Sequence, residues 1–205
     1  MRLLIATGNE GKKKEILEFF ETLSPRFEFL TLKDFPEIEE PEENGSTFEE
    51  NALIKARYFG EAFEIPTISE DAGLVLDAFP EKFGLKTRRE IEADTDEEWL
   101  EKFLFLLEGE VSRGAAFFSA MAFYDPQKKK EQVFMGKCEG VIIQQPEVGL
   151  EEGIPVSAVF QPEGADTVFS VMSKIEKNEI SHRGKSARKM EMFLFQNFRD
   201  EIKTA

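Results

Sequence analysis

The sequence near the N-terminus combines residue types that can hold a phosphate group. It reads ATGNEGK over residues 6–12, directly after the apolar run 3–5. A buried strand that turns through glycine into a helix exposes backbone N–H groups, and Lys12 adds a positive charge beside them. The spacing is not that of a P-loop, in which four residues separate the glycines and Ser or Thr follows the lysine. Taken alone, the segment is also typical of an ordinary strand–turn–helix connection.

Two acidic segments supply carboxylates that could bind a hard cation. The run 37–43 ends with Glu43 just before a helix start, and Glu70 and Asp71 follow a short apolar strand predicted at 65–69. Carboxylates at the carboxyl end of a strand are common ligands of such cations in α/β folds. An acidic run is more often a solvated loop, and Glu70-Asp71 could equally form an acidic turn.

A second cationic cluster lies near the C-terminus. It consists of Lys177, His182 and Arg183, where a last helix is predicted to begin, and His182 is the only histidine of the chain. A lone histidine is more often a surface or core residue than a functional one. Its position beside an arginine at a helix entrance favours contact with a ligand.

The composition limits the classes of partner. The chain has 205 residues with 41 acidic and 26 basic side chains, a net charge of −15. Such a field repels nucleic acid, whereas lysines and a divalent cation could still hold a small polyanion. Cys138 is the only cysteine, so we expect no internal disulfide, no cysteine zinc site and a cytoplasmic location. No apolar run is long enough to span a membrane.

Hydrophobic periodicity predicts strands and helices that alternate along one α/β domain. Strands are predicted at 3–7, 27–32, 65–69, 115–124, 132–143 and 158–160, with a further candidate at 167–172. Helices are predicted at 13–23, after Thr47, after Thr95 and after Gly184, with loops at 82–89 and 145–155. Glu50 and Glu98 stand at capping-box spacing from the two threonines. Ser24-Pro25 is expected to end the first helix, and the opening strand–helix–strand unit predicts a parallel pair.

Four motifs, taken in order along the chain, resemble those of the inosine triphosphate pyrophosphatase family, enzymes that hydrolyse deaminated purine nucleoside triphosphates. The motifs are ATGNEGK at 6–12, ENGSTFEENALIKA at 43–56, SEDAGLVLDA at 69–78 and EKNEISHRGKSA at 176–187. A shorter match, EGVI at 139–142, lies between them. Because the matches keep their order over nearly the whole chain, they are far more specific together than any one alone.

The resemblance implies an elongated α/β fold of two lobes, in which a mixed sheet flanked by helices forms a central nucleotide-binding cleft. It also implies Mg²⁺ as cofactor, a homodimer and one domain over residues 1–205. By their positions in the motifs, the residues that would bind the triphosphate are Thr7, Gly8, Asn9, Lys12 and Lys55. The metal ligands would be Glu43 and Asp71, and Asp71 would also be the catalytic proton acceptor.

The resemblance also implies how the base is recognised. The residues that would contact the base and close over it are Lys177, Ser181, His182 and Arg183. Donors to a 6-oxo group would favour hypoxanthine or xanthine, so the expected substrates are inosine and xanthosine triphosphates and their deoxy forms. Water would attack the α-phosphorus and release pyrophosphate. Ala72, also expected at the substrate, replaces the usual Ser, and Glu70 replaces the usual Asp.

The chain departs from the family pattern at 153–160. Where the family reads GFGYDPIF, this sequence reads GIPVSAVF, so Ile154 replaces a stacking Phe and Ser157 replaces an Asp. Aromatic stacking on a base contributes about 1–3 kcal/mol in single-strand nucleic-acid binding, so purine affinity should be weaker. Residues 80–89 differ as well, and only Gly84 and Arg89 remain recognisable.

These departures leave alternatives open. One alternative keeps the chemistry but changes the preferred base. Another is a nucleotide-binding protein that has lost turnover with Ser157. A third is an acidic interaction protein, which would require the motif matches to be accidental.

Overall fold

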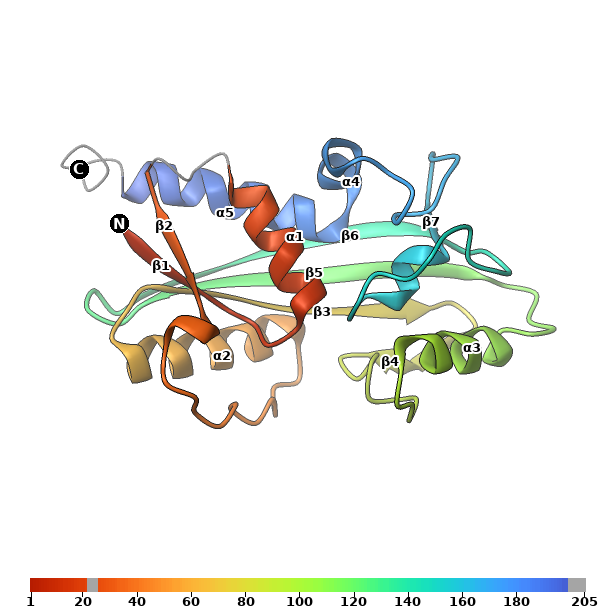
Figure 1. The fold of residues 1–205 in the computed structure, drawn as a ribbon, viewed down its shortest axis with the longest axis horizontal. Coiled ribbons are helices and arrows are strands. Elements are labelled where there is room, and N and C mark those ends of the chain that lie inside the picture. The colour runs from red at the N-terminus through yellow and green to blue at the C-terminus, as the bar shows by residue number, and fades with distance from the viewer. Residues whose placement is uncertain (22–25, 199–205) are drawn as a thin grey trace.

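One mixed sheet runs through the molecule and gives it an elongated shape (Figure 1). The computed structural model describes residues 1–21 and 26–198. Within these residues seven strands form the sheet, in the order β2-β1-β3-β5-β6-β7 with β4 paired to β3. The strands are β1 (Arg2–Ala6), β2 (Glu28–Thr31), β3 (Thr67–Leu76), β4 (Phe79–Gly84), β5 (Gly114–Asp125), β6 (Lys130–Ile142) and β7 (Phe160–Pro162). The predicted α/β class with a mixed sheet is confirmed.

Helices cover both faces of this sheet. They are α1 (Glu10–Phe20), α2 (Phe48–Phe63), α3 (Asp96–Leu106), α4 (Lys174–Ile180) and α5 (His182–Asn197), with 3₁₀ turns η2 (Leu32–Asp34) and η3 (Pro155–Ala158). In Figure 1, α1, α4 and α5 lie above the sheet, and α2 and α3 lie below it. None of the described helices combines the length and the apolar character that a membrane span needs.

Strand direction differs between the two halves of the sheet. β1 is parallel to both β2 and β3, which confirms the predicted parallel pair. β3, β5 and β6 are antiparallel, and β3 pairs with β5 from Thr67 opposite Tyr124 to Leu76 opposite Ala115. β5 and β6, at the positions of two predicted strands, form an antiparallel hairpin and are 12 and 13 residues long. These long strands therefore extend across both ends of the molecule.

Two large hydrophobic clusters lie on this sheet. The first contains Trp99, Phe103 and Phe160, and β5 contributes Ala115 to it. The second consists of side chains from β1, α1, β5 and α5, including Leu3, Ile5, Phe20, Met190 and Leu194, and β5 contributes Phe123 to it. The same strand thus serves both clusters, and this arrangement produces two lobes on one sheet.

β3 differs from its prediction. We expected a strand at 65–69 with Glu70 and Asp71 at its carboxyl end, either as ligands of a cation or in an acidic turn. Instead, Glu70 and Asp71 lie in the middle of β3, opposite Met121 and Ala120 of β5. The strand continues because its backbone groups pair with β5 along the whole length, and both carboxylates find cationic partners.

Other boundaries differ for local reasons. The predicted strand at 167–172 is wrong, because these residues form turns in which the N–H groups of Val171 and Met172 donate to the oxygens of Val168 and Phe169. The predicted strand at 158–160 is divided between η3 and the start of β7, and β4 begins before the predicted loop 82–89. The first helix begins at Glu10, earlier than predicted. Its predicted end, at Leu23 and Ser24-Pro25, lies outside the described residues.

The predicted capping boxes form in part. Thr47 and Thr95 each accept a hydrogen bond from the backbone N–H three residues on, as predicted. The reciprocal bonds reach one residue further back than expected: the carboxylate of Glu50 accepts from the N–H of Ser46, and that of Glu98 accepts from the N–H of Asp94.

A glycine lets α5 approach the sheet closely. A Cβ atom at Gly136 of β6 would overlap the backbone oxygen of His182 and lie 2.8 Å from the nitrogen of Ser186. Only hydrogen fits between β6 and the first turn of α5. The position of His182 therefore depends on the absence of a side chain at residue 136.

We expect Gly136→Ala to lower the free energy of unfolding by about 1–3 kcal/mol, the usual cost of overpacking. Gly149→Ala is a matched control, because a Cβ there would meet no atom within 4 Å. Urea unfolding of both variants measures the difference. Equal midpoints for the two variants would show that α5 does not need this close approach.

Candidate functional site

A cavity of about 470 Å³ lies between the two lobes. Its lining residues come from separate parts of the chain, including 6–9 and Lys12, Glu40 and Glu43, Lys55 of α2, 70–73 of β3, 85–89, 153–157 and the first two residues of α5. Residues far apart in the sequence therefore meet at one place, near the middle of the long strands.

Most of the residues expected at the site line this cavity. They are Thr7, Gly8, Asn9, Lys12, Glu43, Lys55, Asp71, Ala72, His182 and Arg183. Lys177 and Ser181 are not among its lining residues. The Nζ atom of Lys177 lies 2.5 Å from Glu15 and 3.5 Å from Glu151. The Oγ atom of Ser181 accepts a hydrogen bond from the N–H of Gly184 and caps α5.

The connection from β1 to α1 forms one end of the cavity. Asn9 caps α1, because its Oδ1 atom accepts a hydrogen bond of 2.9 Å from the N–H of Lys12. The hydroxyl of Thr7 accepts from the N–H of Asn9. The α1 N-terminus thus lies at the cavity wall, where helix N–H groups and the macrodipole favour an anion. Burial lowers the pKa of Lys12, while Glu70 opposes this effect.

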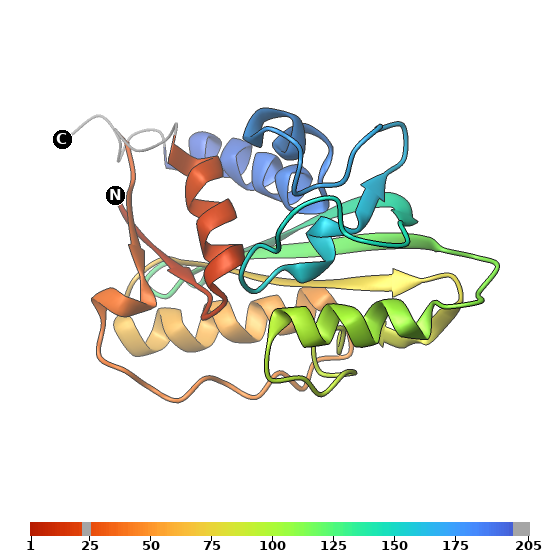
Figure 2. The same ribbon diagram turned by 45° about the vertical axis from the view of Figure 1, so that its right-hand side comes forward.

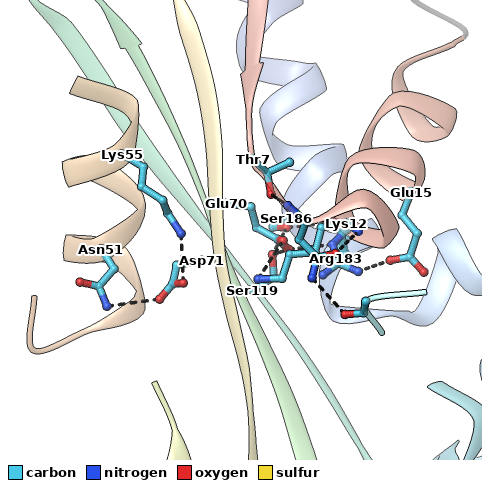
Figure 3. Close-up of polar contacts among 12 residues, drawn as sticks. Thr7, Lys12, Glu15, Asn51, Lys55, Glu70, Asp71, Ser119, Arg183 and Ser186 are labelled. Atoms are coloured by element: carbon cyan, nitrogen blue, oxygen red, sulfur yellow. Dashed lines mark hydrogen bonds and ion pairs between the residues drawn. The ribbon is translucent and has the colours of Figure 1, made fainter. Parts of the chain in front are cut away.

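Glu70 and Asp71 point to opposite faces of β3 (Figure 3). Glu70 accepts hydrogen bonds from the Nε atom of Arg183 at 2.9 Å and the Oγ atom of Ser119 at 2.7 Å. Asp71 lies 3.2 Å from the Nζ atom of Lys55, on the α2 side. Because side chains alternate along a strand, Glu70 and Asp71 do not form one chelating pair, contrary to what was expected of two carboxylates at a strand end.

The Glu70 side is a buried network of charges. Burial alone would raise the pKa of Glu70, but the charges of Arg183 and Lys12 outweigh it and lower the pKa to about 2. Glu15 of α1 also pairs with Arg183 and with Lys177. Arg183 is therefore committed to two carboxylates, which join β3, α1 and α5.

Two carboxylates on the Asp71 side converge on a single cationic atom. The Nζ atom of Lys55 lies 2.5 Å from Glu43 and 3.2 Å from Asp71. Among the described residues no group of three or more His, Cys, Asp or Glu side chains could hold a metal ion. Mg²⁺ commonly takes one or two carboxylates together with substrate phosphates and water. The oxygen donors of Glu43 and Asp71 fit that requirement.

The other end of the cavity is aromatic. The ring of His182 stacks on Phe117, with centroids 4.6 Å apart and planes at 11°. Burial lowers the pKa of His182 to about 3, with a further contribution from Arg183. Its Nδ1 atom is buried and has no hydrogen-bond partner among the described residues. His182 therefore lines the cavity with a neutral imidazole, and its buried Nδ1 atom is left without a partner among the described residues.

Several lining residues were not identified from the sequence. Phe117 and Trp99 both line the cavity. Phe117 lies within a predicted strand and Trp99 within a predicted helix stripe, so each has the signature of an ordinary core residue. Only the residues that face them across the cavity distinguish them from the other aromatic side chains.

Comparisons with known proteins agree with this geometry. A model of the Ham1 family matches residues 3–193. A dITP/XTP pyrophosphatase of Bacillus anthracis is 38% identical over 195 residues, which cover 93% of this chain and 94% of the relative. A solved HAM1 protein from Coxiella burnetii has a TM-score of 0.78 at 28% identity, covering 96% of this chain and 99% of that one. A solved nucleoside-triphosphatase / dITP/XTP pyrophosphatase from Mycobacterium abscessus has a TM-score of 0.70 at 31% identity, covering 95% and 99%.

We expect the stability of the protein to fall in mild acid because of His182. The folded protein keeps this imidazole neutral down to about pH 3, whereas an unfolded chain protonates a histidine near pH 6.5. The unfolded state therefore binds more protons between these values. The free energy of unfolding should fall as the pH drops below about 6.5, by up to about 1.4 kcal/mol per pH unit.

His182→Asn, which stays neutral, should lose this part of the pH dependence. Urea unfolding of the native protein and the variant at about pH 7, 6 and 5 measures both slopes. Parallel curves for the two proteins would mean that His182 is protonated in the folded state.

Proposed function

Since this chain belongs to the Ham1 family, we propose that it hydrolyses inosine and xanthosine triphosphates, and their deoxy forms, to the nucleoside monophosphate and pyrophosphate. The observation that carries this proposal is the convergence of the four sequence motifs on one cavity. A cationic helix start and a neutral histidine stacked on an aromatic ring both line that cavity. The relatives named dITP/XTP pyrophosphatase support the same substrate class.

The phosphate end can neutralise a triphosphate. The start of α1 offers backbone N–H groups, and Lys12 lies at the cavity wall beside them. Lys55 approaches from α2. Its pKa is raised because Asp71 and Glu43 outweigh the effect of burial, so its ammonium stays charged. Charge on the bridging and leaving oxygens would be screened from both sides.

We propose that Glu43 and Asp71 hold Mg²⁺ together with the phosphates. When bound, the ion would supply charge neutralisation and lower the pKa of water. In this proposal Asp71 orients the water and accepts its proton. Attack by this water forms a bond to the α-phosphorus, the bond from that phosphorus to the bridging oxygen breaks, and pyrophosphate leaves.

The base end favours a 6-oxo purine. Arg183 is occupied by Glu70 and Glu15, so His182 is the partner with free hydrogen-bonding capacity. A neutral imidazole can donate one hydrogen bond to a carbonyl oxygen. Phe117 supports the imidazole from behind. From the family resemblance we also propose that the protein is a homodimer located in the cytoplasm.

A second candidate keeps the nucleotide site but has slow turnover or another base preference. The altered loop favours it, since Ile154 and Ser157 both line the cavity where the family has Phe and Asp. The loop lacks an aromatic face for the base and a carboxylate near the phosphates. The two candidates differ in rate and in selectivity, not in the location of the site.

We expect pyrophosphate release, in the presence of Mg²⁺, from inosine and xanthosine triphosphates in preference to guanosine, adenosine and pyrimidine triphosphates. Asp71→Asn should abolish release, because the amide cannot accept the proton of water. Asp166→Asn changes an exposed carboxylate outside the cavity and is the control. A fully active Asp71→Asn variant would remove Asp71 from the catalytic role. Release from no nucleotide by the folded native protein would favour the second candidate.

We expect Ile154→Phe to lower the KM for inosine triphosphate by about ten-fold, because stacking on a base contributes about 1–3 kcal/mol. The kcat value should change little. Ile154→Leu is the control, since it keeps an aliphatic side chain of the same size. Steady-state kinetics of pyrophosphate release separate KM from kcat. An unchanged KM would mean that residue 154 does not contact the base.

A further inference from the structure

Two side chains hold the backbone of Gly153 by hydrogen bonds to its carbonyl oxygen and its N–H group. Its carbonyl oxygen accepts a hydrogen bond of 3.0 Å from the Nδ2 atom of Asn9. Its N–H donates one of 2.6 Å to the Oδ2 atom of Asp96. Gly153 has a φ of +77°, and a Cβ atom there would lie 2.8 Å from Asn9, so only glycine fits. We call Asn9, Gly153 and Asp96 together the Gly153 clasp.

The Gly153 clasp joins the two sides of the cavity. Asn9 stands at the start of α1, and Asp96 is the first residue of α3. Figure 2 shows the connection between β6 and β7, which contains η3, lying between α1 and α3. The next residues, Ile154–Ser157, line the cavity. The clasp therefore fixes one end of the segment that forms this wall.

Asp96 has a second partner that extends the clasp. Its Oδ1 atom lies 2.5 Å from the Nη2 atom of Arg88. The guanidinium of Arg88 lies 5.4 Å from the centre of the Trp99 ring, and the indole N–H of Trp99 donates to the backbone oxygen of Arg88. Both Arg88 and Trp99 line the cavity. One carboxylate thus holds two stretches of the cavity wall.

We propose that Asp96 is a positioning residue that holds the cavity wall 153–157 against the start of α1 and so sets the affinity for the nucleobase end of the substrate. The inference rests on the proposed function for the identity of the substrate. Asp96 acts through Gly153 and Arg88. The carboxylate of Asp96 suits this role because a hydrogen bond from the N–H of Gly153 to an ionised acceptor is about twice as strong as one to a neutral acceptor.

Two variants of Asp96 remove one or both of its contacts and should raise KM by different amounts. Asp96→Ala removes both contacts, and we expect it to raise the KM for inosine triphosphate by about ten-fold or more, the scale of losing one hydrogen bond to a charged group. Asp96→Asn keeps an oxygen for the N–H of Gly153 but loses the ion pair with Arg88, so KM should rise less. The kcat value should change by less than about three-fold in both, because neither variant removes a residue that takes part in the proposed reaction.

The control is Glu97→Ala. Glu97 is also acidic and lies in the first turn of α3, but it is exposed and does not line the cavity. Removing it changes the helix-terminal charge as Asp96→Ala does, without touching Gly153. Its KM and kcat should match those of the native protein.

Trp99 is the only tryptophan of the chain, so its fluorescence gives a second readout that does not depend on turnover. Loss of the Asp96–Arg88 ion pair should shift Trp99 emission to longer wavelength and increase its quenching by acrylamide in both Asp96 variants, but not in Glu97→Ala. Arg88→Ala should produce the same shift, and it keeps the test available should Asp96→Ala fail to fold.

Two outcomes would overturn the inference. One is an unchanged KM in both Asp96 variants. The other is a fall in kcat as large as the rise in KM, together with a lowered melting temperature, because general destabilisation would then explain both changes. If the native protein hydrolyses no nucleotide, the proposed function fails. In that case Trp99 emission alone tests whether Asp96 positions the cavity wall. Identical spectra for the Asp96 variants and Glu97→Ala would then refute this positioning role.

Discussion

The arrangement of the site depends on the buried ion pair between Glu70 and Arg183. An isolated charge in a protein interior is very costly, so each of these side chains requires the other. Glu70 comes from the centre of the sheet and Arg183 from the first turn of α5, and Glu15 brings α1 to the same arginine. Three elements that are distant in the sequence are thereby held at fixed positions around the cavity. The Nζ atom of Lys12, at the start of α1, lies 3.9 Å from the same Glu70, so this lysine belongs to the network as well.

Because side chains alternate along β3, the two adjacent carboxylates lie on opposite sides of the strand and have different partners. Glu70 turns toward the buried network and has a structural role, while Asp71 turns toward Lys55 and the cavity. A single strand can in this way support one wall of the site and supply the carboxylate that we propose accepts the proton of water. Glu70, which stands where the family resemblance has Asp, occupies the supporting position, and the proposed reactive position keeps its Asp.

The sequence could predict the parts of the site that depend on local pattern. The glycine-containing turn before α1 and the threonine caps of α2 and α3 follow from residue types a few positions apart, and the structure has them. The placement of Glu70 and Asp71 within β3 could not be predicted, because it is determined by pairing with β5, about fifty residues later. The same applies to Phe117 and to Asp96, whose partners come from α5 and from the loop at Gly153. Contacts between residues that are far apart in the sequence cannot be predicted from local patterns in a single sequence.

The shared strands also determine how the molecule can move. β5 carries side chains of both hydrophobic clusters, and its hydrogen bonds to β3 and β6 continue from one lobe into the other. Within the part of the chain that the structure describes, these strands run without interruption from one lobe into the other, so a hinge between the lobes would have to distort this pairing. Slow, large domain rotations are therefore disfavoured. Entry and release of a ligand fall instead to the connecting segments around the cavity, whose displacements are smaller and faster, from nanoseconds to microseconds.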